Sequence, residues 1–160
     1  MTLSTRSSER LATYTLYLAW LITIVGTAGS LYFSEIRGLI PCVLCWYQRM
    51  ALYPIAVILL VELLRKDRVA VWYALPFSIV GIALAAWHVA LQEQVVFGSL
   101  VPCEALISCA EKQIEFFGWI TIPILSLTGF VAITALLIAH VLLRRKNLRQ
   151  DWPAASRLVI

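Results

Sequence analysis

Four long runs of apolar residues, each bounded by polar or charged residues, make up most of the chain. An α-helix rises about 1.5 Å per residue, so about 20 apolar residues cross the hydrocarbon layer of a bilayer, which is about 30 Å thick. The four runs reach this length and cover residues 11–33, 45–64, 69–91 and 118–143. The pattern predicts an all-α integral membrane protein, in which residues 1–160 form a single four-transmembrane-helix bundle.

The first run must be distinguished from a secretory signal. Signal sequences carry an apolar stretch of about 7–15 residues, followed by a cleavage site of small residues. The run at residues 11–33 is longer, and residues 26–30 match such a site only loosely. We expect this segment to be retained as a membrane span.

The positions of the basic residues predict the orientation of the bundle. Four spans place both termini and the turn between the second and third spans on one side. Ten of the 13 Lys and Arg residues fall there: Arg6, Arg10, Arg65, Lys66, Arg68, Arg144, Arg145, Lys146, Arg149 and Arg157. Because cytoplasmic segments are enriched in Lys and Arg, both termini are predicted to be cytoplasmic. Residues 35–42 and 92–117 then face outward.

The composition supports a membrane protein and argues against a nucleic-acid binder. Hydrophobic residues make up 61% of the chain and charged residues 14%, whereas soluble domains average about 45–50% and about 25%. The net charge of +4 comes from basic residues at the edges of the apolar runs. A nucleic-acid site would instead gather them with aromatic residues in one patch.

The outer segment at residues 92–117 is long for a loop without structure of its own, which favours a functional role. Its apolar residues recur at helical spacing; they are Leu106, Ala110, Ile114 and Phe117. A helix lying on the membrane surface fits this spacing, and so does a loop whose apolar residues rest in lipid.

All four cysteines fall on the predicted outer side, and two of them form a C-x-x-C pair, Cys42 and Cys45. Such a pair exchanges disulfides, binds zinc or packs silently. Pro41 suits the first turn of a helix, so Cys42 is expected at a helix N-terminus, where free N–H groups and the helix dipole favour a thiolate. A disulfide across so short a ring restrains little chain entropy. A redox role is therefore favoured over a structural one.

The second pair, Cys103 and Cys109, lies in the long outer segment. An outward loop can carry a relay between a soluble partner and the first pair, and it can equally be closed by a structural disulfide. A zinc site shared by all four cysteines is not expected, because such sites usually hold closely spaced knuckles or added histidines. Here His88 and His140 both fall inside spans.

Two polar residues near the outer end of the spans are candidates for a binding site. Arg49 follows Cys45 by four residues and lies on the same helix face, where a cation in hydrocarbon requires an anionic or carbonyl partner. Alternatively, the side chain of Arg49 extends to the lipid headgroups on the outer side. His88 lies near the outer end of the third span, at the depth of Arg49. Its alternative is a hydrogen bond to a neighbouring helix.

Residues 41–49, with the sequence Pro-Cys-Val-Leu-Cys-Trp-Tyr-Gln-Arg, resemble the signature of the DsbB disulfide-forming membrane proteins, including the shorter BdbC branch. The resemblance continues through residues 88–92 and 109–118 and covers all four spans. It implies a protein of the bacterial plasma or inner membrane with its redox cysteines on the extracytoplasmic side. It also implies that electrons pass from a DsbA-like thioredoxin-fold partner to a membrane quinone, which sustains disulfide bond formation.

The resemblance implies a role for each thiol. Cys103 would form the mixed disulfide with the partner, Cys109 would exchange with Cys42, and Cys45 would face the quinone. Better-known DsbB proteins separate the second pair by a much longer stretch, whereas five residues separate it here, as in the short branch. The order of the exchange steps is therefore left open.

Arg49 and His88 match positions that the family uses at the quinone ring, where they would hydrogen-bond a ring carbonyl. A strong acceptor is also needed on redox grounds, because a thiol couple near about −200 mV cannot reoxidise a partner near about −120 mV. The chain has no haem-attachment motif and no glycine-rich nucleotide motif. Ubiquinone and menaquinone both remain possible cofactors.

Two other readings compete with this one. In the first, the four cysteines form two static disulfides in a non-enzymatic membrane protein. In the second, the chain is an enzyme similar to vitamin K epoxide reductase, which also has four helices and two cysteine pairs. That family carries its C-x-x-C pair on the last core helix, whereas here the pair begins the second span.

Overall fold

The computed structural model describes residues 3–65, 69–93, 115–116 and 120–155. These residues form four α-helices, one π-helical turn and two very short strands. In chain order they are α1 (Leu3–Leu31), η1 (Tyr32–Ile36), α2 (Val43–Arg65), α3 (Ala70–Gln92), β1 (Glu115–Phe116), β2 (Ile120–Thr121) and α4 (Ile122–Ala155).

Four helical segments are long and apolar enough to cross a membrane, which confirms the predicted fold class. They are Ser8–Ile36, Val43–Arg65, Ala70–Gln92 and Ile122–Lys146. The last one begins at Ile122, later than the predicted start at residue 118, because β2 pairs antiparallel with β1 just before it. Pro123 follows within the first turn of α4, where the missing N–H of proline has no helical acceptor to lose.

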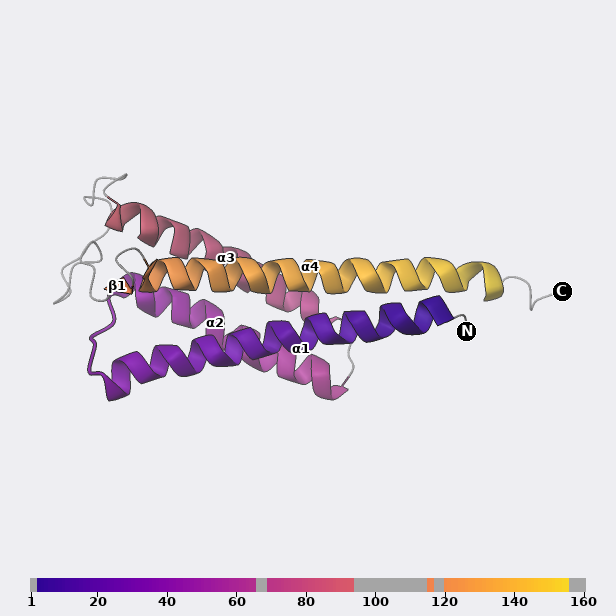
Figure 1. Cartoon of the computed structure of the whole chain (residues 1–160), viewed down its shortest axis with the longest axis horizontal. Coiled ribbons are helices and arrows are strands. Elements are labelled where there is room, and N and C mark those ends of the chain that lie inside the picture. Colours follow the sequence, from indigo (N-terminus) through magenta and orange to yellow (C-terminus); the bar gives the residue numbers. More distant parts are fainter. Residues whose placement is uncertain (1–2, 66–68, 94–114, 117–119, 156–160) are drawn as a thin grey trace.

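The four helices close into a bundle in which each helix has two neighbours (Figure 1). Helix α1 packs against α2 and α4, and α3 packs against the same two helices. Both chain ends lie at one end of the bundle, while β1 and the start of α2 lie at the other. This is the arrangement that four consecutive crossings require. The cytoplasmic position of the termini stays a prediction.

Small side chains lie in the helix contacts together with larger ones such as Ile55 and Leu59, while many other large apolar side chains face outward. Ala19, Ala74 and Ala85 are completely buried between helices. Tyr14 and Leu64, by contrast, are 63% and 74% exposed. Lipid solvates apolar surface as well as a protein core does, so helices in membranes associate through close packing of small residues. The distribution fits a bundle surrounded by lipid.

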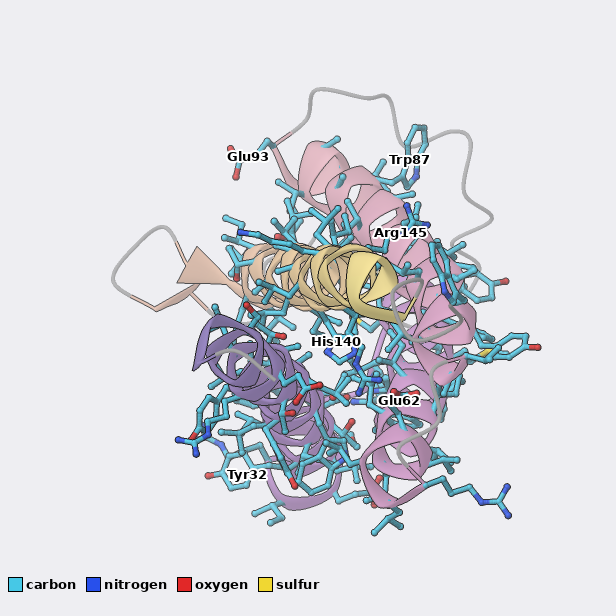
Figure 2. The ribbon with its side chains drawn as sticks, turned by 90° about the vertical axis from the view of Figure 1, so that its right-hand side faces the viewer. Tyr32, Glu62, Trp87, Glu93, His140 and Arg145 are labelled. Carbon is cyan, nitrogen blue, oxygen red and sulfur yellow. The ribbon has the colours of Figure 1, made fainter. Side chains whose placement is uncertain are left out.

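Polar side chains point into the bundle, as Figure 2 shows for Glu62 and His140. His140 donates a hydrogen bond from Nδ1 to the Ala12 carbonyl at 2.7 Å, which links α4 to α1 near the chain ends. Polar groups in hydrocarbon are costly, so they face protein partners and not lipid. His140 therefore lies at the end of the bundle opposite the C-x-x-C pair.

Candidate functional site

The C-x-x-C pair begins α2 after a short connection from α1. Gly38 adopts a positive φ of 66°, a conformation that glycine enters without the Cβ clash of other residues, and the chain turns there towards α2. Helix α2 starts at Val43, and the Cys42 carbonyl accepts a hydrogen bond from the Trp46 amide at 3.1 Å. The predicted position of Cys42 at the helix N-terminus is confirmed.

The two thiols lie in contact but differ in their surroundings. Cys42 Sγ donates to Cys45 Sγ at 3.1 Å, and no disulfide joins these two cysteines, the ones that the structure describes. Cys42 is buried against Leu44 and Leu91, whereas Cys45 is half-buried. We call Cys42 the inner thiol and Cys45 the outer thiol, according to their burial in the bundle.

The expected thiolate at Cys42 is not what the structure favours in the reduced pair. The hydrogen bond to Cys45, followed by burial, raises the pKa of Cys42 to about 12, while the contact with His88 acts in the opposite direction. A thiol that donates to its neighbour loses that bond when it is deprotonated, and a buried charge loses hydration. These two effects outweigh the lowering of the Cys42 pKa that a helix N-terminus is expected to cause.

His88, on α3, lies next to the inner thiol. Its Nε2 is 3.7 Å from Cys42 Sγ, and its Nδ1 is 3.1 Å from the side-chain nitrogen of Gln48. With the amide nitrogen of Gln48 donating to Nδ1, the neutral ring carries its hydrogen on Nε2 and directs it at the sulfur. Gln48, His88 and Cys42 thus form one chain of contacts between α2 and α3.

Gln48 is the site residue that sequence reasoning missed. Its side chain is buried on α2, and it fixes the ring of His88. The signal was present, because an uncharged polar residue inside an apolar span, three positions after Cys45, faces protein partners more often than lipid.

Arg49 has the carbonyl partner that its position demanded. Its guanidinium donates to the Ser30 carbonyl at 2.8 Å and lies 5.5 Å from the ring of Trp46. Ser30 is close to the junction of α1 with the π-helical turn η1, where hydrogen bonds widen from four-residue to five-residue spacing. The prediction of an anionic or carbonyl partner for Arg49 is confirmed.

A cavity of about 690 Å³ lies beside the outer thiol, between α1, α2 and α4. Its polar lining includes Cys45, Gln48 and Arg49, and most of the remaining wall is apolar. Among the described residues that line it, Arg49 carries the one charge. Ligand pockets in proteins are about 300–1,000 Å³ and mostly apolar, with a few convergent polar groups. The cavity has these properties.

The structure brings together four of the six predicted site residues. The ligand atoms of Cys42, Cys45 and His88 lie within 4.8 Å of one another, and Arg49 lies one helical turn further along α2. His88 contacts Cys42 and is not among the described residues that line the cavity. Its predicted contact with a quinone ring stays a prediction. Cys103 and Cys109, with residues 94–114 of the outer segment, lie outside the described residues.

Known proteins that are similar to this chain are disulfide bond formation proteins, which fits a site built on paired thiols. Residues 10–140 match the family described as disulfide bond formation protein DsbB. Disulfide bond formation protein C of Bacillus subtilis (strain 168) is 41% identical over 118 residues, which are 74% of this chain and 86% of the relative. A probable disulfide formation protein of Chlamydia caviae is 42% identical over 123 residues, 77% of this chain and 88% of the relative.

A third relative covers more of the chain. The probable disulfide formation protein C 2 of Bacillus anthracis is 40% identical over 134 residues, which are 84% of this chain and 95% of the relative. No solved structure matches the chain. The extent of these matches and the paired thiols at the start of α2 lead to one conclusion. The chain belongs to the DsbB family of disulfide bond formation proteins, and it is a multi-pass membrane oxidoreductase that forms disulfide bonds.

Proposed function

We propose that this protein reoxidises a DsbA-like thioredoxin-fold dithiol outside the cytoplasm and passes the two electrons to a membrane quinone. The observation that carries the proposal is the shared position of Cys45 and Arg49 on the wall of one apolar cavity. A reactive sulfur and a cation there face a space of about 690 Å³ that suits a flat, apolar ring.

The redox balance fixes what the site must do. Each thiol–disulfide exchange between the partner, the Cys103–Cys109 pair and the Cys42–Cys45 pair moves a disulfide without net loss of electrons. Only the renewed bond between Cys42 and Cys45 needs an outside acceptor, because two thiols then give up two electrons and two protons. A quinone supplies that acceptor and is reduced to the hydroquinone.

The residues of the site divide this work. Cys45 is the thiol beside the cavity, so electrons leave through it. The guanidinium of Arg49 donates hydrogen bonds where negative charge develops on a ring oxygen. His88 directs its Nε2 at Cys42 and lowers the pKa that burial and Cys45 raise, so it helps the inner thiol to lose its proton. Gln48 holds the ring of His88 in place.

The test uses purified protein, a reduced DsbA-like partner and a soluble quinone. The unaltered protein should oxidise the partner and reduce the quinone in equal amounts. Cys45→Ser should abolish quinone reduction, because no second sulfur remains to close the disulfide. Thr13→Ala removes a hydroxyl from α1 at a position that does not line the cavity, and it should retain activity. Quinone reduction that survives in Cys45→Ser would refute the proposed path of the electrons.

A further inference from the structure

Three ligand atoms that metals favour converge at the start of α2. The sulfurs of Cys42 and Cys45 and a ring nitrogen of His88 all lie within 4.8 Å of one another. The two sulfurs are 3.1 Å apart, and Nε2 of His88 is 3.7 Å from Cys42 Sγ. Thiolate and imidazole are the ligands that hold thiophilic cations such as Zn²⁺ and Co²⁺.

The spacing of these atoms is close to that of a tetrahedral site. Bonds of about 2.3 Å to sulfur and about 2.0–2.1 Å to nitrogen place neighbouring tetrahedral ligands roughly 3.5–3.8 Å apart. The 3.7 Å between His88 and Cys42 already fits. The two sulfurs must separate by about 0.7 Å, and Cys45 Sγ, which lies within 4.8 Å of the His88 ring nitrogen, must reach the same tetrahedral spacing from it. Both adjustments fall on the half-buried side chain of Cys45.

Gln48 supplies the support that a histidine ligand needs. Metal-bound histidines almost always donate their second N–H to an oxygen, which fixes the tautomer. Gln48 presents its amide nitrogen to Nδ1 at 3.1 Å. A half-turn of this amide presents its oxygen, which accepts a hydrogen from Nδ1 and leaves the lone pair on Nε2 free for a metal. The same residue therefore supports both states of the ring.

We propose that the reduced Cys42–Cys45 pair and His88 bind Zn²⁺, and that the bound ion holds the pair reduced and stops turnover. Two thiols release two protons as the ion binds, and nothing is oxidised or reduced. Two thiolates balance the charge of the ion in this buried place. A disulfide removes both sulfur ligands, so the oxidised protein does not bind. The effect on turnover, though not the binding, rests on the proposed function.

The zinc site that the sequence analysis did not expect was one shared by all four cysteines. The site inferred here takes only the first pair and replaces the second with His88, which the fold brings from α3. Three protein ligands leave the fourth tetrahedral position to water or another donor, as in zinc sites that are not purely structural.

The binding test uses the full chain with Cys103→Ser and Cys109→Ser, so that the two remaining thiols are those of the site. The reduced protein is titrated with Co²⁺, whose visible absorption reports tetrahedral thiolate ligation, and Zn²⁺ is then added in competition. We expect one ion per chain, displaced by Zn²⁺, and no binding after oxidation. This comparison of reduced and oxidised protein needs no change in the site itself.

Variants then identify the nitrogen ligand and its support. His88→Ala should weaken Co²⁺ binding at least about tenfold, and Gln48→Ala roughly 10–100-fold, as for other residues that orient a ligand. His140→Ala removes the other histidine, at the opposite end of the bundle, and should leave the affinity unchanged. Absent binding in the reduced protein, or equal affinity in His88→Ala and the parent, would overturn the site.

Turnover separates this inference from the proposed function. Stoichiometric Zn²⁺ added to the reduced, otherwise unaltered protein should block quinone reduction, and a chelator should restore it. Binding without any block would overturn the inhibitory role. If metal-free protein fails to reduce quinone while Co²⁺ still binds, the proposed function fails and the metal site stands. If quinone is reduced and no Co²⁺ binds, only the metal site fails.

Discussion

The Cys42 thiol lies between two neighbours that act on its proton in opposite directions. Cys45 accepts its hydrogen and thereby favours the neutral form, whereas His88 favours the thiolate. Burial adds to the effect of Cys45. A buried inner thiol with a pKa raised to about 12 reacts slowly until a neighbour changes, which protects the reduced pair from unwanted attack.

Replacing these neighbours should move the pKa of Cys42 in opposite directions. Cys45→Ala removes the largest cause of the raised value, so the pKa falls towards the ordinary 9.0. His88→Ala removes the opposing contact, so the pKa rises further. The midpoint of Cys42 alkylation against pH, measured by mass spectrometry in a Cys103→Ser, Cys109→Ser background with chelator, reports each shift. Midpoints that do not move in either variant would contradict this account of the thiol.

Arg49 should affect quinone binding more than thiol exchange. Arg49→Ala loses a charge-assisted hydrogen bond of about 1.5–3 kcal/mol, which predicts a quinone KM raised roughly tenfold or more. Partner oxidation measured in a single turnover, before quinone is needed, should change little. Arg37→Ala removes an exposed basic residue that does not line the cavity and serves as the control. An unchanged KM would favour an arginine that only reaches the headgroups.

For individual residues, the sequence predicts which side chains belong to the site better than it predicts which side chains contact one another. The C-x-x-C motif and the half-buried cation at Arg49 were predictable, because these residue types are unusual inside an apolar span. The contact between His88 and Cys42 joins α3 to the start of α2, and no local pattern encodes such a distance. The partner of Gln48 also lies on another helix, so the sequence could mark Gln48 as a polar residue inside a span but could not identify His88 as its partner.

Gly81 of α3 packs directly against the side chain of Phe130 on α4. A Cβ at this position would overlap the ring of Phe130, which is itself buried. Phe130 also lines the cavity, and α3 carries His88. The packing at Gly81 therefore connects a helix contact to one wall of the cavity.

Gly81→Ala should destabilise the bundle. The added methyl group must displace Phe130, and overpacking of this kind costs about 1–3 kcal/mol. Thermal unfolding in detergent should show a lower Tm. Gly129→Ala, on α4, meets nothing within 4 Å and gains helix propensity, so its Tm should be unchanged or higher. Equal Tm values for the two variants would mean that α3 and α4 are not packed closely at Gly81.

Hydropathy predicts the number of helices but not the exact residues at which each helix begins and ends. Apolar length alone predicted four helices, because the cost of unpaired backbone groups in lipid leaves few alternatives. The start of α4 was placed too early, because a two-residue pairing with β1 is not visible in hydropathy. The π-helical turn η1 was not predicted either, since hydropathy does not report whether backbone hydrogen bonds have four-residue or five-residue spacing.

The orientation of the whole molecule can be tested with single cysteines in an otherwise cysteine-free chain. Ser8→Cys lies near the predicted cytoplasmic end, and Ile36→Cys lies in the exposed turn at the other end. A membrane-impermeant maleimide should label Ile36→Cys in intact cells and Ser8→Cys only after permeabilisation. Neither change alters a basic residue, so the charge pattern that sets the topology is kept. The reverse labelling would place the thiol pair in the cytoplasm.

Which helices are neighbours could not be predicted from the sequence. Hydropathy and charge define spans and direction, but the packing of α1 against both α2 and α4 arises from side-chain fit. The cavity exists only because of that arrangement, since its wall draws on all three helices. The sequence therefore predicted a reactive pair and a cation, and the fold supplied the space between them.

The cavity wall includes Leu21, Val25 and Leu125, and each of these side chains is more than half exposed. We therefore expect an apolar ligand of this cavity to enter sideways, by partition from the surrounding acyl chains and not from water. Its relevant concentration is a mole fraction in the membrane or micelle. Diluting the hydrophobic phase with extra detergent, at fixed total ligand, weakens apparent affinity in proportion, although no protein contact has changed.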